Sequence, residues 1–268
     1  GRADREPRKI FIQKRLAEFW KDPEEESSVL LTGSGYSKAD FAEGQLWESE
    51  AYRFQTIDRQ RDHFWAVVRA WRSDGVSRLL WEGKILTVEQ VRQRQLQYKV
   101  KDNCTWEDCG YEDGMVYDDC VRYGWRALKG DKSPGFPRRI KRGGNVMTVN
   151  SYISPDKVAL APCGKYAGWL AWCVNPVKDI LNQYKSGRGP GWENPDDMSN
   201  EYRTQINSEI KKDVISPTDK QVSRRWVKIA SRPNHLWDCE AMQIALALYA
   251  RIIRGTETEE EELTAAAE

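Results

Sequence analysis

The sequence predicts an α/β protein with a mixed five-stranded β-sheet, flanked by helices and carrying an added hairpin and loop region. Residues 52–86 show three strand-like segments separated by turn residues, which is typical of an antiparallel meander. Residues 103–131 show a strand, a helix and a strand at a spacing that implies a parallel crossover. A length of 268 residues with 40% hydrophobic content accommodates one large domain with an accessory segment.

The meander is expected to come from "YRFQTIDRQ" (52–60), "HFWAVVRAW" (63–71) and "RLLWEGKIL" (78–86). These segments are rich in β-branched and aromatic residues, which favour strands. The turn between the second and third contains Asp74-Gly75, a strong hairpin signal.

A helix is expected over residues 87–100, with Thr87 as its N-cap. The crossover then consists of a strand in "NCTWE" (103–107), a helix in "MVYDDCVRYG" (115–124) and a strand in "WRALKGD" (125–131). Three antiparallel strands followed by a strand–helix–strand unit make a mixed sheet with helices on its faces.

The remaining chain is less regular, and "KSPGFPRRIKRGGN" (132–145) is predicted to be a basic loop. Further strands are expected over residues 146–154 and 157–163, and helices over 175–187 and from about 199. A hairpin is expected over 211–226. The last helix lies within 233–253, and its apolar stripe at spacings of three and four also carries a carboxylate, Asp238. A buried carboxylate is costly unless it is paired, so Asp238 should bind a cation or cap another group.

The expected organisation is a lead-in over residues 1–50, one domain over 51–255 and an acidic, disordered tail over 256–268. The lead-in contains "RKIFIQKRLAEFW", which has the pattern of a short amphipathic helix. Lys and Arg total 42 against 41 for Asp and Glu, so net charge alone does not indicate a nucleic-acid-binding protein.

Several classes of protein are disfavoured by what the sequence lacks. No run approaches the roughly 18 apolar residues of a membrane span, and no signal-peptide pattern opens the chain, so a cytoplasmic location is expected. No G-x4-G-K-[ST] loop is present, which argues against an ATPase. Two histidines leave little room for a Ser-His-Asp or Cys-His nucleophile.

Three aspartates are the candidate catalytic residues. Asp58 closes the first strand and Asp108 the fourth, so parallel neighbouring strands would bring both carboxylates to one edge of the sheet. Asp238 could reach the same place if the last helix packs across that sheet. Crowded carboxylates repel one another unless a cation is bound, and Mg²⁺ or Mn²⁺ prefers oxygen ligands. Two such ions would stabilise a phosphodiester displacement. Each aspartate taken singly is more often a turn or cap residue, and it is the arrangement of the three on two strands and the last helix that favours a site.

The motifs "TIDRQ", "DCGYEDGMVY", "ALKGD" and "NHLWDCE", in that order, resemble the nuclease domain of large terminase subunits from tailed bacteriophages of the lambda-like kind. The resemblance spans roughly residues 52–254 and includes "RGPGWENP…EYRTQINSE" and "RWVKIASRPNHLWDCE". The segment "FIQKRLAEFW" is similar to the linker that follows the ATPase domain in this family.

This resemblance implies a ribonuclease H-like fold and two-metal-ion cleavage of concatemeric double-stranded DNA during genome packaging, in the host cytoplasm. It implies that Asp58, Asp108 and Asp238 are the catalytic metal ligands, with Mg²⁺ or Mn²⁺ as cofactor. The implied partners are DNA, a terminase small subunit, a portal and the family's ATPase domain, which is missing here. Glu107 stands where the family has an apolar strand residue, so Glu107 remains an alternative ligand to Asp108.

Further candidate residues surround this centre. Glu82 could add a fourth carboxylate, and Lys129 could meet a phosphate or an active-site carboxylate. Basic clusters that could contact DNA phosphates without sequence preference are Arg138, Arg139, Lys141 and Arg142 in the basic loop, and Arg224 and Arg225 in the later hairpin.

Two alternatives to a packaging endonuclease remain open. A non-catalytic DNA-binding or assembly module could keep the fold and would tolerate loss of any one aspartate. A junction resolvase or transposase core would share the three carboxylates and differ only in its substrate.

Overall fold

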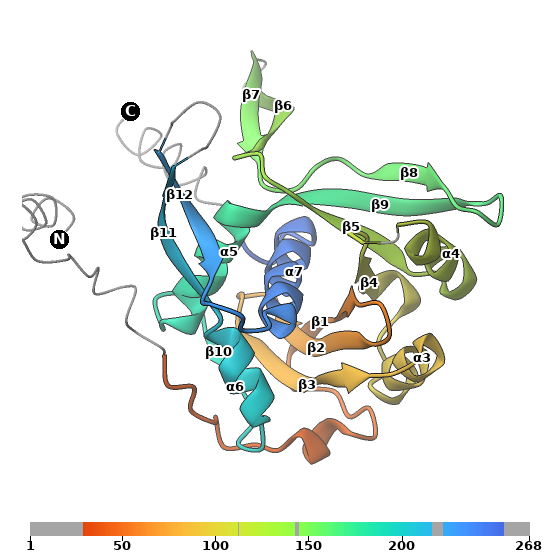
Figure 1. Cartoon of the computed structure of the whole chain (residues 1–268), viewed down its shortest axis with the longest axis vertical. Coiled ribbons are helices and arrows are strands. Elements are labelled where there is room, and N and C mark those ends of the chain that lie inside the picture. The colour runs from red at the N-terminus through yellow and green to blue at the C-terminus, as the bar shows by residue number, and fades with distance from the viewer. Residues whose placement is uncertain (1–28, 112, 143–144, 216–221, 255–268) are drawn as a thin grey trace, which may run out of the picture.

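The computed structural model describes residues 29–111, 113–142, 145–215 and 222–254, and its centre is an eight-stranded mixed sheet (Figure 1). The strands of this sheet, in spatial order, are β10 (Trp192–Glu193), β3 (Ser77–Ile85), β2 (Phe64–Arg72), β1 (Glu50–Arg59), β4 (Thr105–Asp108), β5 (Arg126–Asp131), β9 (Tyr166–Cys173) and β8 (Lys157–Leu160). The sheet makes the protein an α/β protein, as expected.

Two hairpins project from the body of the molecule in Figure 1. They are β6 (Phe136–Arg142) with β7 (Asn145–Ser151), and β11 (Glu209–Ile215) with β12 (Val222–Lys228). The helices are η2 (Lys38–Phe41), α3 (Val88–Gln97), η3 (Asp102–Cys104), α4 (Asp113–Tyr123), α5 (Val174–Lys185), α6 (Asn200–Ile206) and α7 (His235–Tyr249).

The predicted meander and crossover are both present. Strands β1, β2 and β3 pair antiparallel, and β4 lies parallel to β1 and to β5. The Asp-Gly turn forms between β2 and β3, where Gly75 has a φ of +85°, a conformation that favours glycine. The Thr87 hydroxyl accepts a hydrogen bond from the Gln90 amide and caps α3, as expected.

The sheet is larger than the five strands predicted. Strand β9 extends it beside β5 in parallel, β8 pairs antiparallel with β9, and β10 adds a short parallel strand beside β3. The pairing of β9 with β5 joins residues about 40 positions apart, such as Leu128 with Leu170. Residues 166–173 were not among the predicted strands, although their apolar and aromatic content is typical of one.

The basic segment 132–145, predicted to be a loop, instead contains strand β6. Its backbone pairs in register with β7, from Phe136 opposite Ser151 to Arg142 opposite Asn145. The prediction was wrong because this strand projects from the body and follows no apolar alternation. The hairpin predicted within 211–226 is confirmed as β11–β12, and the helix expected from Ser199 is confirmed as α6.

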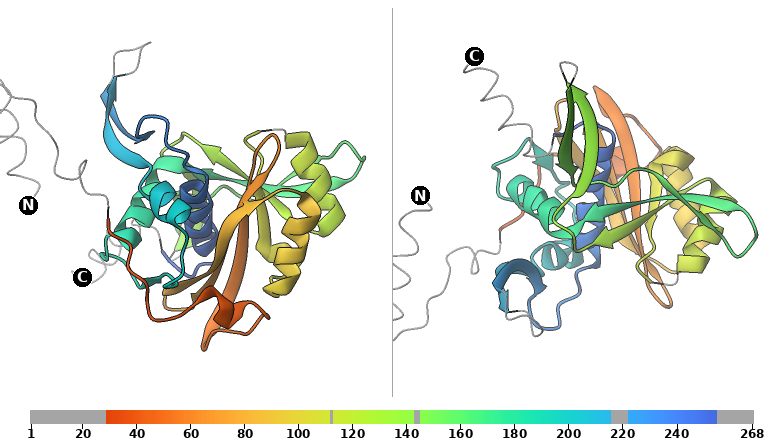
Figure 2. Two further views of the ribbon diagram at one scale, coloured as in Figure 1. Left: turned by 60° about the horizontal axis from the view of Figure 1, so that its bottom comes forward. Right: turned by 90° about the horizontal axis from the view of Figure 1, so that it is seen from above.

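Helices cover the two faces of the sheet unequally (Figure 2). Helices α5, α6 and α7 lie on one face, and α3 and α4 lie on the other. The described part of the lead-in packs onto the sheet, where Tyr36 and Phe41 join a buried cluster with Val68 and Leu80. The helix expected at residues 8–20 and the acidic tail lie outside the described residues.

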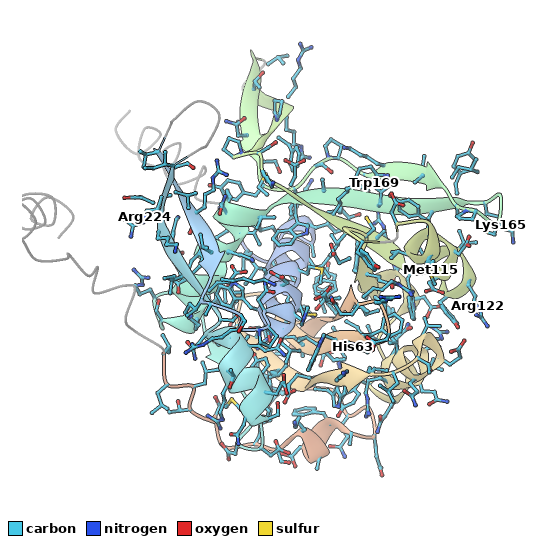
Figure 3. The ribbon with its side chains drawn as sticks, viewed as in Figure 1. His63, Met115, Arg122, Lys165, Trp169 and Arg224 are labelled. Atoms are coloured by element: carbon cyan, nitrogen blue, oxygen red, sulfur yellow. The ribbon has the colours of Figure 1, made fainter. Side chains whose placement is uncertain are left out.

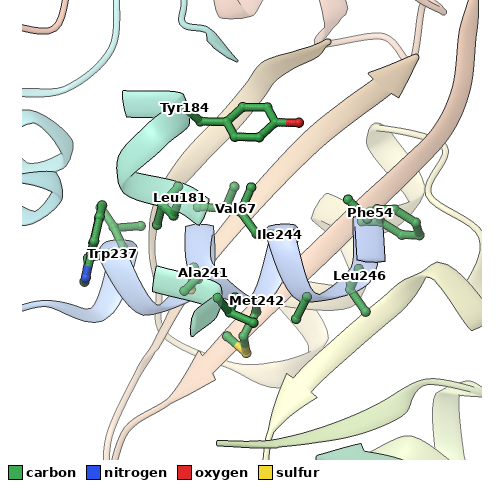
Figure 4. Close-up of a cluster of buried hydrophobic side chains, with 14 of the residues drawn as sticks. Phe54, Val67, Leu181, Tyr184, Trp237, Ala241, Met242, Ile244 and Leu246 are labelled. Atoms are coloured by element: carbon green, nitrogen blue, oxygen red, sulfur yellow. The ribbon is translucent and has the colours of Figure 1, made fainter. Parts of the chain in front are cut away.

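Helix α7 is the centre of the largest core cluster (Figure 4). Its side chains share this cluster with Phe54 and Val67 of the sheet and with Leu181 and Tyr184 of α5. Nearly every residue from Leu236 to Ala247 is buried, so the single apolar stripe predicted for this helix understates its burial. A helix enclosed between a sheet and another helix has no face left for water.

No helix in the described ranges combines the length and the apolar character needed to cross a membrane.

Candidate active site

The three predicted aspartates come from β1, β4 and α7, as the sequence suggested. Ile57 and Glu107 are paired in the parallel register of β1 and β4, so Asp58 and Asp108 follow at the same level of neighbouring strands. Side chains at one level of neighbouring strands share a face. The face is the one covered by α7, whose first turn carries Asp238.

Polar contacts dock α7 across β1 at this point. The Thr56 hydroxyl donates a hydrogen bond to the Cys239 carbonyl at 3.0 Å, and the Gln243 amide donates to the Phe54 carbonyl at 3.1 Å. These groups are buried, and buried polar groups that find partners define a unique packing position. They set the start of α7 above the end of β1.

Asp108 shows that the three carboxylates influence one another. Burial, as the largest cause, and the negative charges of Asp58 and Asp238 together raise the pKa of Asp108 to about 7. The backbone amide of Gly110, which donates to Asp108 Oδ2 at 3.3 Å, and the ammonium of Lys129 act in the opposite direction. At Asp108, burial and the negative charges of Asp58 and Asp238 therefore outweigh the Gly110 amide and the positive charge of Lys129.

Asp58 is held by donors on two sides. Its Oδ1 accepts a hydrogen bond from the Gln60 side-chain amide at 2.9 Å, and its Oδ2 lies 2.8 Å from His235 Nδ1. The His235 ring stacks on Trp65, with centroids 6.0 Å apart and planes 6° from parallel. Asp58 is thus oriented before any ligand arrives.

Asp238 is held by a buried cation. Lys178 Nζ of α5 lies 2.7 Å from Asp238 Oδ1, and the Asn234 amide donates to Asp238 Oδ2 at 2.8 Å. Glu209, the first residue of β11, accepts from the same Lys178 with both carboxylate oxygens. The expectation that the carboxylate of Asp238 binds a cation is therefore met within the protein itself, by the ammonium of Lys178.

Sequence reasoning missed Lys178, Glu209 and His235. Lys178 lies on the buried face of α5 with Val177 and Leu181, so a lysine within a largely apolar stripe was a usable signal. His235 stands three residues before Asp238, a spacing that puts both on one side of a helix. Glu209 has no such local signal, because only the tertiary structure brings it to Lys178.

The two alternative carboxylates have other partners. Glu107 is fully buried, and its Oε1 accepts from Arg59 Nε at 2.7 Å. Successive strand residues face opposite sides of a sheet, so Glu107 lies on the face of α4, away from Asp108. Glu82 accepts from the Ser199 amide at 2.9 Å and from Lys38 at 3.0 Å. Glu82 therefore anchors the start of α6, and neither residue joins the three aspartates.

Among the predicted basic residues, Lys129 is one whose charge acts on the site. Lys129 is exposed at the end of β5, and its charge lowers the pKa of Asp108. Arg138 and Arg139 are exposed on β6, and Arg224 and Arg225 are exposed on β12. Figure 3 places Arg224 on its projecting hairpin. Lys141 and Arg142 belong to β6, but their side chains lie outside the described ones.

A cavity of about 710 Å³ lies beside the other end of α7. Arg138, Arg251 and Arg254 contribute to its lining, so it favours anions. Helix α7 has 15 residues, which places its two ends about 22 Å apart at 1.5 Å per residue.

The chemistry of the donor set fits a hard divalent cation, whereas the present arrangement of side chains is not that of a formed metal site. Within the described ranges, no group of three or more His, Cys, Asp or Glu side chains is arranged to hold a metal ion. Two of the three aspartates are turned to protein donors, Asp58 to His235 and Asp238 to Lys178. Carboxylate oxygens that crowd enough to raise a pKa are the ligands that Mg²⁺ and Mn²⁺ prefer.

Comparisons of this chain with models of known protein families, with curated proteins and with solved structures find no match.

Proposed function

We propose that this protein is a metal-dependent endonuclease that cuts double-stranded DNA, with a ribonuclease H-like core, and that it serves as the nuclease domain of a large terminase subunit. The observation that carries the proposal is the geometry of the three aspartates. Strands β1 and β4 run parallel in register, so Asp58 and Asp108 follow at one level, and α7 with Asp238 is docked across β1 by buried hydrogen bonds. Three elements far apart in sequence bring these carboxylates together, and such a cluster is a candidate functional site.

The order of the central strands supports the choice of fold. Strands β3, β2 and β1 are antiparallel, and β4 and β5 continue from β1 in parallel. This is the arrangement expected from the ribonuclease H-like resemblance, with β8, β9 and β10 as additions.

In this proposal Asp58, Asp108 and Asp238 hold the cations. Bound Mg²⁺ or Mn²⁺ would supply Lewis-acid activation of water and of the scissile phosphate. Gln60 and His235 orient Asp58, the Gly110 amide orients Asp108, and Lys178 with Asn234 orients Asp238. Residues that orient the ligands in this way are a regular part of metal sites.

DNA would be held through its phosphates. Exposed arginines on both projecting hairpins and the arginine-lined cavity offer contacts that carry no sequence preference. An ATPase domain, a small subunit and a portal are the proposed partners, and the host cytoplasm is the proposed location. A DNA-binding assembly module without catalysis, or a resolvase or transposase core, are the alternatives that the following experiment addresses.

Supercoiled plasmid should be converted to nicked and linear forms by the purified chain with Mn²⁺ or Mg²⁺, but not with EDTA. Asp108→Asn should abolish this cleavage, because the variant loses a cation ligand. Glu107→Gln is the matched control, since its side chain lies on the opposite face of the sheet, where its Oε1 accepts from Arg59. Gel electrophoresis reports the products, and circular dichroism reports folding.

Retained cleavage in folded Asp108→Asn, with loss in folded Glu107→Gln, would move the metal ligand to Glu107. Absence of cleavage under every condition, from folded wild-type protein that still binds DNA, would favour the assembly module. Cleavage of four-way junctions in preference to linear duplex would favour a resolvase.

A further inference from the structure

Lys178 is a buried lysine whose ammonium contacts two carboxylates. The residue is 4% exposed, and its Nζ lies 2.7 Å from Asp238 Oδ1 and 2.9 and 2.8 Å from Oε1 and Oε2 of Glu209. The ammonium thus lies between two carboxylates, those of Asp238 and Glu209. Burial opposes the charged form, yet the charges of Asp238 and Glu209 raise the pKa of Lys178 above its usual value.

Glu209 is itself fixed in place. Its Oε1 accepts from the Asn234 amide at 2.6 Å, and its Oε2 accepts from the Trp237 indole at 3.2 Å. Asn234 also donates to Asp238. Lys178 is therefore held where it is by a rigid acceptor on one side, and it meets Asp238 on the other.

The three aspartates thus differ in how far the protein already compensates them. Both oxygens of Asp238 have donors, one of them a full positive charge. Asp108 has one long hydrogen bond from the Gly110 amide. A cation that approaches Asp108 meets a carboxyl group with one amide donor, whereas a cation that approaches Asp238 meets an ammonium 2.7 Å from the oxygen.

We propose that Lys178 is a built-in counter-ion that competes with a divalent cation for Asp238, an inference that rests on the proposed function. The two cation positions are then unequal: the position served by Asp58 and Asp108 fills first, and the one that requires Asp238 fills only when Lys178 gives up its contact. Lys178 is a positioning residue in this account, since it acts through Asp238.

The double variant Lys178→Met/Glu209→Gln isolates this competition from net charge. In the wild type, one positive and two negative side chains leave a net charge of −1 at Lys178, Glu209 and Asp238. In the double variant Asp238 alone remains charged, so the net charge is again −1. Met has a length close to that of the lysine stem, and Gln preserves the acceptor for Asn234.

Mn²⁺ binding in the absence of DNA, followed by calorimetry and electron paramagnetic resonance, is the measurement. We expect the weaker dissociation constant to fall on the order of tenfold in the double variant, while the tighter one stays unchanged. The single variant Glu209→Gln should weaken the second event further, because the ammonium then binds Asp238 alone. Adding Asp238→Asn to either protein should remove the weaker event.

Equal or weaker binding of the second Mn²⁺ in the folded double variant would overturn the inference while leaving the metal centre in place. No Mn²⁺ binding by the wild-type protein would overturn both proposals. A measurement on the wild type alone covers the case in which the variant fails to fold: the side-chain ¹⁵N resonance of Lys178 should shift at the second Mg²⁺ equivalent and not at the first. A shift at the first equivalent, or none at all, would count against competition.

Discussion

At the scale of single residues, Asp108 has the fewest hydrogen-bond and ion-pair partners of the three candidate aspartates. Asp58 lies against His235 and Asp238 against Lys178, whereas Asp108 has the Gly110 amide and the more distant charge of Lys129. Burial and two neighbouring carboxylates bring its pKa to about 7, so at neutral pH the residue is balanced between its two forms. A cation would favour the ionised form.

The pKa of Asp108 predicts a pH-dependent effect of Asp108→Asn on stability in EDTA. The pKa is about 7 in the folded protein against an ordinary 3.8, so the folded state binds the proton more tightly between pH 4 and 7. The contribution of this group is therefore complete below about pH 4 and is lost as the pH rises through 7. Because asparagine carries no charge, the variant should be more stable than the wild type at pH 8, by on the order of 2–4 kcal/mol, and much less so at pH 5.

Urea unfolding of both proteins at pH 5 and pH 8 measures this difference. Glu48→Gln, at an exposed carboxyl, is the control. Its unfolding curves at pH 5 and pH 8 should match those of the wild type. Unfolding midpoints that keep the same separation at both pH values would contradict the assignment of Asp108 as the destabilised carboxyl.

At the scale of elements, the β11–β12 hairpin is tied to the site by its base and exposes arginines farther along. Lys211 of β11 pairs with Asp179 of α5, and the Trp226 indole of β12 donates to the same carboxylate at 2.9 Å. The Trp226 ring also lies 5.5 Å from Trp237 of α7, centroid to centroid. A hairpin fixed in this way can hold the phosphate backbone of the proposed DNA substrate in a defined place relative to Asp238.

Replacing Arg138, Arg139, Arg224 and Arg225 together by alanine should weaken duplex binding equally for unrelated sequences. Each lost phosphate contact lowers the slope of log affinity against log salt by about 0.9, so the slope should fall by about 3 to 4. Fluorescence anisotropy at several salt concentrations measures the slope.

Arg122→Ala/Lys165→Ala is the matched control, because Figure 3 shows both residues on the part of the molecule far from Arg224. A loss of slope of about 1.8 in this control, the full amount for two phosphate contacts, would mean that the duplex follows another surface. An unchanged slope in the fourfold variant would exclude the two hairpins as phosphate contacts.

At the scale of the whole molecule, Arg69 joins five segments in the core. Its side chain is fully buried and pairs with Glu240 of α7 at 2.9 and 3.0 Å. It also donates to Ser77 at 3.2 Å, to Asn194 at 3.1 Å and to Tyr202 of α6 at 3.3 Å. The start of α7 is thus linked to the sheet and to α6 through one guanidinium.

Arg69→Met should lower the free energy of unfolding by about 3–5 kcal/mol, because it leaves Glu240 buried without its cation. Arg72→Met is the matched control on the same strand, since its ion pair with Asp74 is exposed and such pairs contribute about 0–1 kcal/mol. Thermal and urea unfolding of both variants compare the two costs. Similar costs would show that the buried pair is not a major anchor of α7.

Much of this architecture could be predicted from local patterns. Alternating apolar residues and the Asp-Gly turn predicted β1 to β3, and capping residues predicted α3 and α6. Strand β6 could not be predicted in this way, because its sequence shows no apolar alternation, and the place of β9 beside β5 could not, because that pairing joins residues about 40 positions apart.

The candidate site likewise has a part that could be predicted from sequence and a part that could not. Asp58, Asp108 and Asp238 were found because strand ends and the start of a helix can be placed from sequence, and parallel neighbouring strands carry their ends to one edge. Their charge partners were not found: Lys178 and Glu209 stand 31 positions apart, and Lys178 and Asp238 stand 60 apart. Local sequence determines which residues form each strand and helix, because propensity and periodicity act over a few residues. Only the tertiary structure decided which cation compensates which carboxylate, because burial and Coulomb interactions depend on distance in space.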